Sequence, residues 1–157
     1  MAGDAMTGID RAALEMILSR VQRPGRYIGG EMHAVVREEA AFRMALSYPD
    51  LYEIGMSNNG IRILYDIANR VPGVACERVF AVEADYEAAL RASGIPLYTL
   101  ETFTPLGALS LIGFNVGHEL LATNILQILD LGGIPLLRRD RGEGCPVVIA
   151  GGAAVSN

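Results

Sequence analysis

The stretch YPDLYEIGMSNNG (residues 48–60) lies between the apolar run FRMALS and the periodic segment IRILYDIANR. The apolar run has the length and composition of a buried strand. The periodic segment is typical of a helix that begins at about Asn59 and places four residues on one face: Ile61, Leu64, Tyr65 and Ala68. A strand, a polar turn and a helix in this order predict a β-α unit, whose turn either caps the helix or holds a ligand.

Strand and helix patterns alternate on both sides of this unit. Apolar periodicity predicts an N-terminal helix over residues 10–21, and the segment RPGRYIGGE then forms a loop. Further expected strands are ERVFAV (77–82), PLYTLE (96–101), LSLIGF (109–114), IPLLRR (134–139, a strand or an extended segment) and PVVIAGG (146–152). Further expected helices are DYEAALRAS (85–93) and HELLATNILQILDL (118–131), of which the second is apolar on nearly all sides and is expected to be buried.

Repeated β-α units with apolar strands predict an α/β fold with a parallel sheet and right-handed crossovers. We expect residues 1–38 to form the N-terminal helix and loop, and residues 39–157 to form the α/β domain. The purely apolar run PVVIAGG favours a strand that is covered on both faces. No helix follows it, so we expect either a domain truncated at its C-terminal end or a cover from another chain, with Val147, Val148 and Ile149 or their neighbours exposed in the chain alone.

Composition narrows the classes of function. A chain of 157 residues, 51% of them hydrophobic, is the size of one globular domain with a real core. The net charge of −5 argues against nucleic-acid binding, which needs clustered cations. No basic signal region opens the sequence and no apolar run approaches the ~18–20 residues of a membrane span, so we expect a cytoplasmic protein without a membrane partner. All 13 basic residues are arginine, which excludes a Schiff-base or P-loop lysine. Cys76 and Cys145 share no C-x-x-C spacing and are expected to be buried, inert thiols.

Ligands of open α/β sheets bind at the carboxyl ends of the strands, so three turns are candidate sites and should lie at one edge. In the first turn, Asp50, Tyr52 and Gly55 have the spacing D-x-Y-x-x-G. A structural interpretation is also open, in which Asp50 makes a turn, Gly55 permits an unusual backbone conformation and Ser57 or Asn58 caps the helix. The candidate ligand contacts in this turn are Asp50, Tyr52, Gly55, Met56, Ser57, Asn58 and Gly60.

The other two turns carry weaker signals. In the second turn, G-x-N-x-G around Asn115 has the spacing of a nucleophile elbow, but an amide cannot act as that nucleophile. His118 and Glu119 follow as candidate ligand contacts, although His118 is more simply interpreted as a helix cap. In the third turn, Gly151 and Gly152 would let a ligand approach the backbone, and their N–H groups could meet an anion.

Several long blocks, in order, resemble the N-terminal region of a family of cobalamin-binding-domain radical S-adenosylmethionine (SAM) proteins. The blocks are RPGRYIGGE, YPDLYEIGMSNNGIRILY, ERVFAVEADYEAALR, IPLYTLET, LIGFNVGHELLATNILQILDLGGIPL and PVVIAGG, and together they span nearly the whole chain. The resemblance implies a flavodoxin-like, Rossmann-type cobalamin-binding fold, followed in full-length members by a barrel domain. In that barrel a Cys-x-x-x-Cys-x-x-Cys motif holds a [4Fe–4S] cluster. This motif is absent from the chain, so the cluster and SAM are expected only in a longer parent protein, with the barrel as the natural partner.

The resemblance also implies how cobalamin would bind. Cobalamin domains that supply a lower axial ligand carry D-x-H-x-x-G in the first turn, and here Tyr52 takes the place of the histidine. Cobalamin would therefore bind without histidine ligation, because a neutral phenol is a poor cobalt ligand. Asn115 stands where the family more often has serine, and Ala153 where proline tends to follow the paired glycines.

These features leave three hypotheses. The first is a cobalamin-binding-like module of a radical SAM iron–sulfur enzyme, catalytically incomplete by itself and without catalytic or metal-binding residues of its own. The second is a non-catalytic structural or interaction domain that has kept the fold but lost the cofactor, and the third is a flavin- or nucleotide-binding domain. Self-association through the apolar C-terminal strand is a further expectation.

Overall fold

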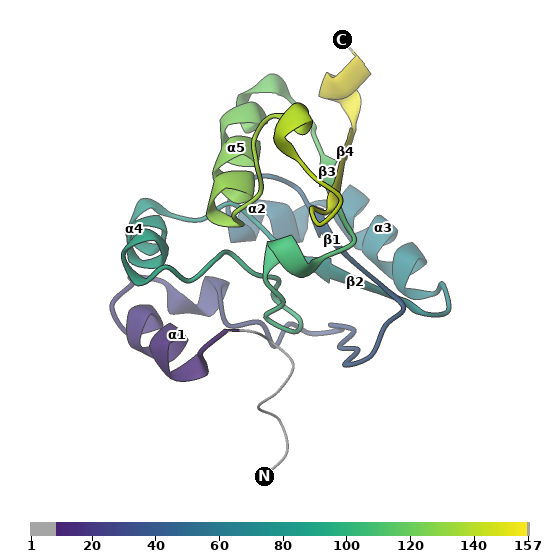
Figure 1. Cartoon of the computed structure of the whole chain (residues 1–157). Coiled ribbons are helices and arrows are strands. Elements are labelled where there is room, and N and C mark those ends of the chain that lie inside the picture. Colours follow the sequence, from purple (N-terminus) through teal and green to yellow (C-terminus); the bar gives the residue numbers. More distant parts are fainter. Residues whose placement is uncertain (1–8, 157) are drawn as a thin grey trace.

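The computed structural model describes residues 9–156 and contains one parallel sheet of four strands in the order β2-β1-β3-β4. The strands are β1 (Phe42–Ser47), β2 (Val74–Arg78), β3 (Leu111–Asn115) and β4 (Val147–Gly151). Their register pairs Met44 of β1 with Cys76 of β2 and with Leu111 of β3, which in turn pairs with Val147 of β4. The expected α/β class, with helices around a parallel sheet, is confirmed (Figure 1).

Within residues 9–156, five α-helices flank the sheet. They are α1 (Arg11–Leu18), α2 (Tyr52–Ser57), α3 (Asn59–Asn69), α4 (Ala84–Ser93) and α5 (Ala122–Leu131). Short 3-10 helices lie at Pro24–Arg26 (η1), Leu106–Ala108 (η2), Glu119–Leu121 (η3), Arg138–Asp140 (η4) and Ala153–Ser156 (η5). Local chemistry accounts for several ends: Asp10 caps α1 through its carboxylate, Asn58 caps α3, and Gly94 ends α4 in the left-handed region at a φ of 71°.

The two faces of the sheet are covered unequally. On one face, buried residues of α1, α4 and α5 share the larger core with Ala45, Ile112 and Phe114, and α1 packs against α4. On the other face, α3 packs through Ile61 and Tyr65 against residues of β1 and β2, forming a smaller core with Leu46 and Cys76. Figure 1 shows α4 and α5 on one side of the sheet and α3 on the other. No helix within residues 9–156 is long and apolar enough to cross a membrane.

The N-terminal segment shares the larger core with the rest of the fold. Leu14 and Leu18 of α1 are buried in it together with Val21 and Tyr27 of the following loop. Residues 1–8 of the predicted N-terminal segment, and Asn157, lie outside the described residues.

Two predicted strands are misplaced. ERVFAV was expected over 77–82, but β2 ends at Arg78 because residues 79–82 leave the sheet as a buried connection to α4. PLYTLE forms no strand, and Tyr98 makes only an isolated antiparallel bridge to Pro105. At the end of β2, the Arg78 N–H donates to the Glu101 carboxylate at 2.7 Å, and the Arg78 carbonyl accepts the Leu100 N–H at 2.9 Å.

The C-terminal third differs from expectation in three further places. IPLLRR forms no strand, and its end lies in η4. The helix expected over 118–131 begins as η3 and becomes α5 at Ala122, and Leu126 on it is 48% exposed rather than buried. β4 is not covered on both faces, because Val147 and Ile149 are 59% and 50% exposed, while Val148 packs against the larger core.

Candidate functional site

The turns after β1, β3 and β4 meet at the carboxyl edge of the sheet. Asn115, the last residue of β3, donates a hydrogen bond from Nδ2 to Oδ1 of Asn58, which lies 3.4 Å away in the turn after β1. Gly152 directly follows β4, and a Cβ on it would lie 2.9 Å from Asn115 Oδ1. β1 and β3 are neighbours, but the chain leaves them in opposite directions along the sheet. The three turns thus meet at the topological switch point, where open α/β sheets bind ligands.

Two glycines of this edge lie against side chains of neighbouring turns. A Cβ on Gly60 would be 2.8 Å from Asn115 Nδ2, and a Cβ on Gly117 would be 2.9 Å from the hydroxyl oxygen of Tyr48. Both distances are shorter than real Cβ contacts, so a larger residue would displace the Asn115 or Tyr48 side chain. The glycines therefore allow the turns to pack on one another.

The paired glycines after β4 differ from each other. Gly152 has a φ of 113°, a conformation that favours glycine, and a Cβ on it would lie 2.5 Å from the backbone oxygen of Val116. Gly151 has no neighbouring heavy atom within 4 Å of such a Cβ, and its carbonyl accepts the Val116 N–H at 2.7 Å. Gly151 thus leaves space for an approaching group, while Gly152 is fixed against β3's turn.

Asp50 and Tyr52 of the first turn are engaged with protein partners. The Asp50 carboxylate accepts the N–H of the next residue, Leu51, at 2.7 Å. The Tyr52 hydroxyl donates to Glu31 at 2.6 Å, and its ring packs edge-on against Phe80. Burial and the neighbouring Glu31 carboxylate raise the pKa of Tyr52 to about 12, so that the phenol stays neutral at physiological pH.

Three more predicted residues of this turn lie in α2, a helix that the sequence interpretation missed. Gly55 does not adopt an unusual backbone conformation, because it is an ordinary helical residue, and a Cβ on it would lie 2.2 Å from the Phe80 ring. The Met56 sulfur accepts a hydrogen bond from Arg78 at 3.4 Å. Ser57 donates to a carbonyl of its own helix at 2.9 Å, so the helix cap that was assigned to Ser57 or Asn58 belongs to Asn58.

His118 and Glu119 are exposed at the start of η3, beside Leu120, which is 84% exposed. His118 occupies the N-cap position but makes no side-chain capping hydrogen bond, so the simpler interpretation of this residue as a hydrogen-bonded cap is wrong. Its role as a ligand contact stays a prediction. Within residues 9–156, no three or more His, Cys, Asp and Glu side chains are grouped so that they could hold a metal ion.

A family model described as "Radical SAM proteins, N-terminal" matches residues 60–157, which is more than half of the chain. The chain belongs to this family. The match begins at the second residue of α3 and runs to the end of the chain, including β2, β3 and β4. No curated protein matches the chain, and no solved structure matches it.

In this radical SAM N-terminal domain, the turns at the carboxyl edge of the sheet touch one another, so a corrin ring would fit there only if the turns moved apart. A ligand entering between the ends of β1 and β3 would have to separate Asn58 from Asn115, and Tyr48 from Gly117. The residue in the place of the axial histidine, Tyr52, is turned to Glu31 and remains a neutral phenol.

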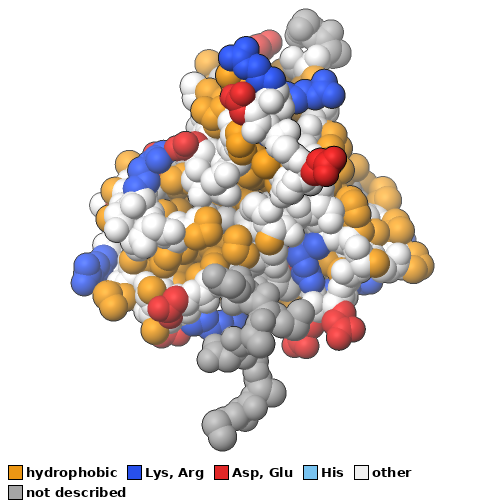
Figure 2. All heavy atoms as spheres, viewed as in Figure 1, with side chains coloured by type: hydrophobic (Ala, Val, Ile, Leu, Met, Phe, Trp, Pro, Cys, Tyr) orange, Lys and Arg blue, Asp and Glu red, His pale blue; other side chains and the backbone are white. Residues whose placement is uncertain are grey.

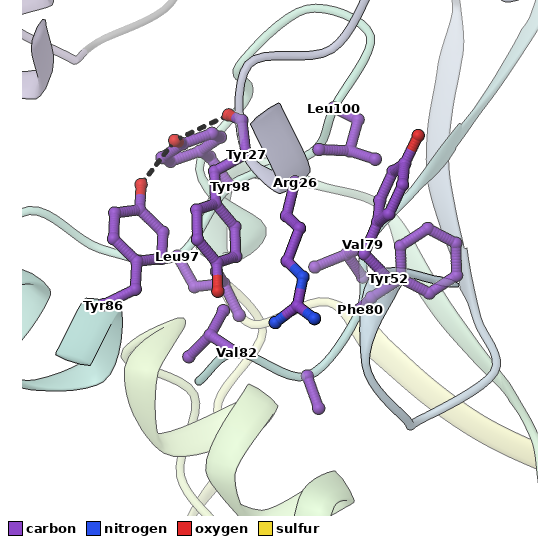
Figure 3. A pocket seen from close by; sticks show the side chains of 11 residues that line it. Arg26, Tyr27, Tyr52, Val79, Phe80, Val82, Tyr86, Leu97, Tyr98 and Leu100 are labelled. Atoms are coloured by element: carbon purple, nitrogen blue, oxygen red, sulfur yellow. Dashed lines mark hydrogen bonds between the residues drawn. The ribbon is translucent and has the colours of Figure 1, made fainter. Parts of the chain in front are cut away.

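The sequence interpretation missed a buried arginine that ties the N-terminal segment of this radical SAM domain to the candidate edge. Arg26 has a side chain that is only 5% exposed and donates to Glu53 of α2 at 2.8 Å and to Glu83 before α4 at 2.7 Å. The hydrogen bond to Glu83 raises the pKa of Arg26 above its usual range despite burial. Figure 3 shows Arg26 between Tyr27 on one side and Tyr52 on the other, in a cavity of about 20 Å³, which has room for about one water molecule.

Tyr48 was also missed, although it packs against both hydrophobic cores. The sequence held one signal for the position of Tyr48, which is Gly117 in the facing turn. A Cβ on Gly117 would lie 2.9 Å from the Tyr48 hydroxyl oxygen. For Arg26 no such signal exists, since one arginine in a glycine-rich loop has the same pattern whether it is buried or solvated.

Proposed function

We propose that this chain is a non-catalytic, cytoplasmic accessory module of a radical SAM enzyme, and that it supports the catalytic domain through protein contacts. The observation that carries the proposal is the direct packing of the three turns on one another at the switch point. The Asn58–Asn115 hydrogen bond and the close approach of Tyr48 to Gly117 place protein atoms where a cofactor would enter. Membership of the radical SAM N-terminal family supplies the partner.

The chemistry of the chain agrees with an accessory role. It contains two cysteines, of which Cys76 is buried, while a [4Fe–4S] cluster with a three-cysteine motif needs three. The candidate side chains of the first turn donate to or accept from protein groups, as Tyr52 does with Glu31 and Met56 with Arg78. In this proposal the radical chemistry belongs to the catalytic domain, and the module positions it.

The test is binding to a radical SAM catalytic domain of this family, expressed separately and purified with its cluster under anaerobic conditions. Sedimentation velocity of the two proteins alone and mixed measures whether they associate. We expect a one-to-one complex at micromolar concentrations. Independent sedimentation of the two proteins at all ratios would reject the accessory role.

A second candidate function is cobalamin binding, which is favoured by the meeting of the three turns at the topological switch point. Binding would require the turns to open, and Asn58, Asn115 and the backbone of Gly151 would then contact the cofactor. The remaining candidate ligand contacts in the three turns are Asp50, Tyr52, Gly55, Met56, Ser57, Gly60, His118, Glu119 and Gly152. Hydroxocobalamin mixed with the protein, followed by gel filtration and the visible spectrum, tests this function. Corrin that co-elutes with the protein at micromolar concentration would support it, and corrin that elutes separately would remove it.

A further inference from the structure

Among the described residues, no helix covers one half of a sheet face. On the side of α3, the smaller core covers β1 and β2 through Ile61 and Tyr65. Val147 and Ile149 of β4 point to the same side, because the alternate residue Val148 packs into the larger core on the other side, and they remain 59% and 50% exposed. The sheet is therefore bare over β3 and β4.

The flank of α3 that borders this bare area is apolar. Gly60 fixes the orientation of the helix, because it lies against Asn115 at the end of β3. Steps of three to four residues from Gly60 continue along the same flank. They reach Leu64 and Ile67, which are 46% and 56% exposed. Val71, which is 48% exposed, follows two residues after the end of α3. The opposite flank carries the charged residues Arg62 and Asp66.

We name the surface formed by Leu64, Ile67, Val71, Val147 and Ile149 the α3–β4 face. None of these residues is charged, and Figure 2 shows hydrophobic side chains on the side of the molecule where α3 and β4 lie. Two strands span about 10 Å, which is also the distance at which helices pack side by side, roughly 8–10 Å. The bare part of the sheet thus has the width of one helix lying beside α3.

The size of the α3–β4 face distinguishes between occupants. Five half-exposed side chains amount to a patch of a few hundred Å². A stable dimer buries roughly 800 Å² on each partner, so this patch is too small to hold a second copy of the chain by itself. A single amphipathic helix that lies on the sheet beside α3 needs no larger area, since the rest of its domain contacts other surfaces.

We propose that an amphipathic helix of the radical SAM catalytic domain docks on the α3–β4 face and completes the helix layer on that side of the sheet. The inference rests on the accessory function proposed above. The apolar side of the docking helix contacts Ile67 of α3 and Ile149 of β4, and its polar side faces the solvent or the rest of the catalytic domain.

The experiment measures binding of the separately expressed catalytic domain to four forms of the chain: wild type, Ile67→Glu, Ile149→Glu and Met16→Glu. Both test positions are half exposed, so the chain should still fold, and circular dichroism with thermal unfolding verifies this. Met16 on α1 is 57% exposed, which matches the 56% of Ile67, and serves as the control on a different surface. We expect the dissociation constant to rise at least about tenfold for each test variant and to stay within about twofold for the control.

Three other results would overturn the proposal in different ways. Unchanged binding of both test variants would place the contact elsewhere and leave the accessory function standing. Absence of binding by the wild type would reject the accessory function and, with it, this inference. A concentration-dependent doubling of the mass of the chain alone, abolished by Ile149→Glu, would show that a second copy covers the face.

Discussion

Replacing Gly55 by alanine tests whether this glycine serves the packing of the protein or the approach of a ligand. Gly55 is a buried helical residue of α2, and a Cβ on it would lie 2.2 Å and 2.3 Å from two carbon atoms of the Phe80 ring. Ordinary contact begins at 3.4 Å, so the ring would have to retreat by 3.4 − 2.2 = 1.2 Å. Phe80 is itself 5% exposed and has little room to move.

The expected cost follows from two opposing effects. Overpacking of a filled core costs about 1–3 kcal/mol. Alanine is more favourable than glycine inside a helix by roughly 0.5–1 kcal/mol, which offsets part of that cost. We therefore expect Gly55→Ala to lower the free energy of unfolding by about 0.5–2 kcal/mol.

Urea unfolding of four proteins measures the effect: wild type, Gly55→Ala, Phe80→Leu and the double variant. Leucine removes the ring edge, so Gly55→Ala should cost about 1 kcal/mol less in the Phe80→Leu background than in the wild type. An equal cost in both backgrounds would refute the packing explanation. A Gly55→Ala variant as stable as the wild type would refute it as well.

Two further predictions concern buried polar groups. Arg26→Met keeps the packing of the stem but removes the ion pairs to the half-exposed Glu53 and Glu83, so we expect the free energy of unfolding at pH 7 to fall by about 1–2 kcal/mol. Burial of Glu53 acts to raise its pKa, but the hydrogen bond from Arg26 and the other favourable interactions of the carboxylate together outweigh burial, and the pKa of Glu53 lies below its usual 4.5. The contribution of the Arg26–Glu53 contact to the free energy of unfolding is therefore present above pH 4.5 and is lost as the pH falls through the lowered pKa. Arg26→Met should not show this loss of stability at low pH, and urea unfolding of the wild type and the variant at pH 7 and pH 3.5 measures the difference. A variant as stable as the wild type at pH 7 would contradict the ion-pair role. Cys145 was expected to be buried but is partly exposed, whereas Cys76 is buried and its burial raises its pKa to about 12. Ellman's reagent at pH 8 should therefore react with Cys145 in the native protein and with Cys76 only in denaturant, and equal native rates for both would contradict this.

Much of the fold could be predicted because each strand and helix carried its own apolar pattern. FRMALS coincides with β1, and the helix expected from about Asn59 begins at that residue. Apolar segments were wrongly predicted as strands where their residues are buried outside the sheet. Residues 79–82 are buried as a connection, and their composition is the same as that of a strand. PVVIAGG has the composition of a covered strand, but within the described residues no helix lies over its α3 side.

The site was predictable in position but not in contacts. Parallel strands place their carboxyl ends at one edge, so the meeting of the turns of Asn58, Asn115 and Gly152 followed from the order of elements. The partner of each side chain did not follow, because Tyr52 is directed to Glu31 by the N-terminal loop, 21 residues away in sequence. The same limit applies to Gly55, whose neighbour Phe80 lies on the connection after β2.

The claim that the turns at the switch point contact one another in place of a cofactor can be measured directly by nuclear magnetic resonance. In the ¹⁵N-labelled chain, the Asn115 side-chain amide should show nuclear Overhauser effects to Gly60, because its nitrogen lies 2.8 Å from where a Cβ on that glycine would be. Hydroxocobalamin is then added in excess. We predict that the Asn58 and Asn115 side-chain signals and these Overhauser effects remain unchanged. Loss of the Overhauser effects, together with shifted signals for both asparagines on addition of hydroxocobalamin, would show that the turns open around the corrin and would contradict the account.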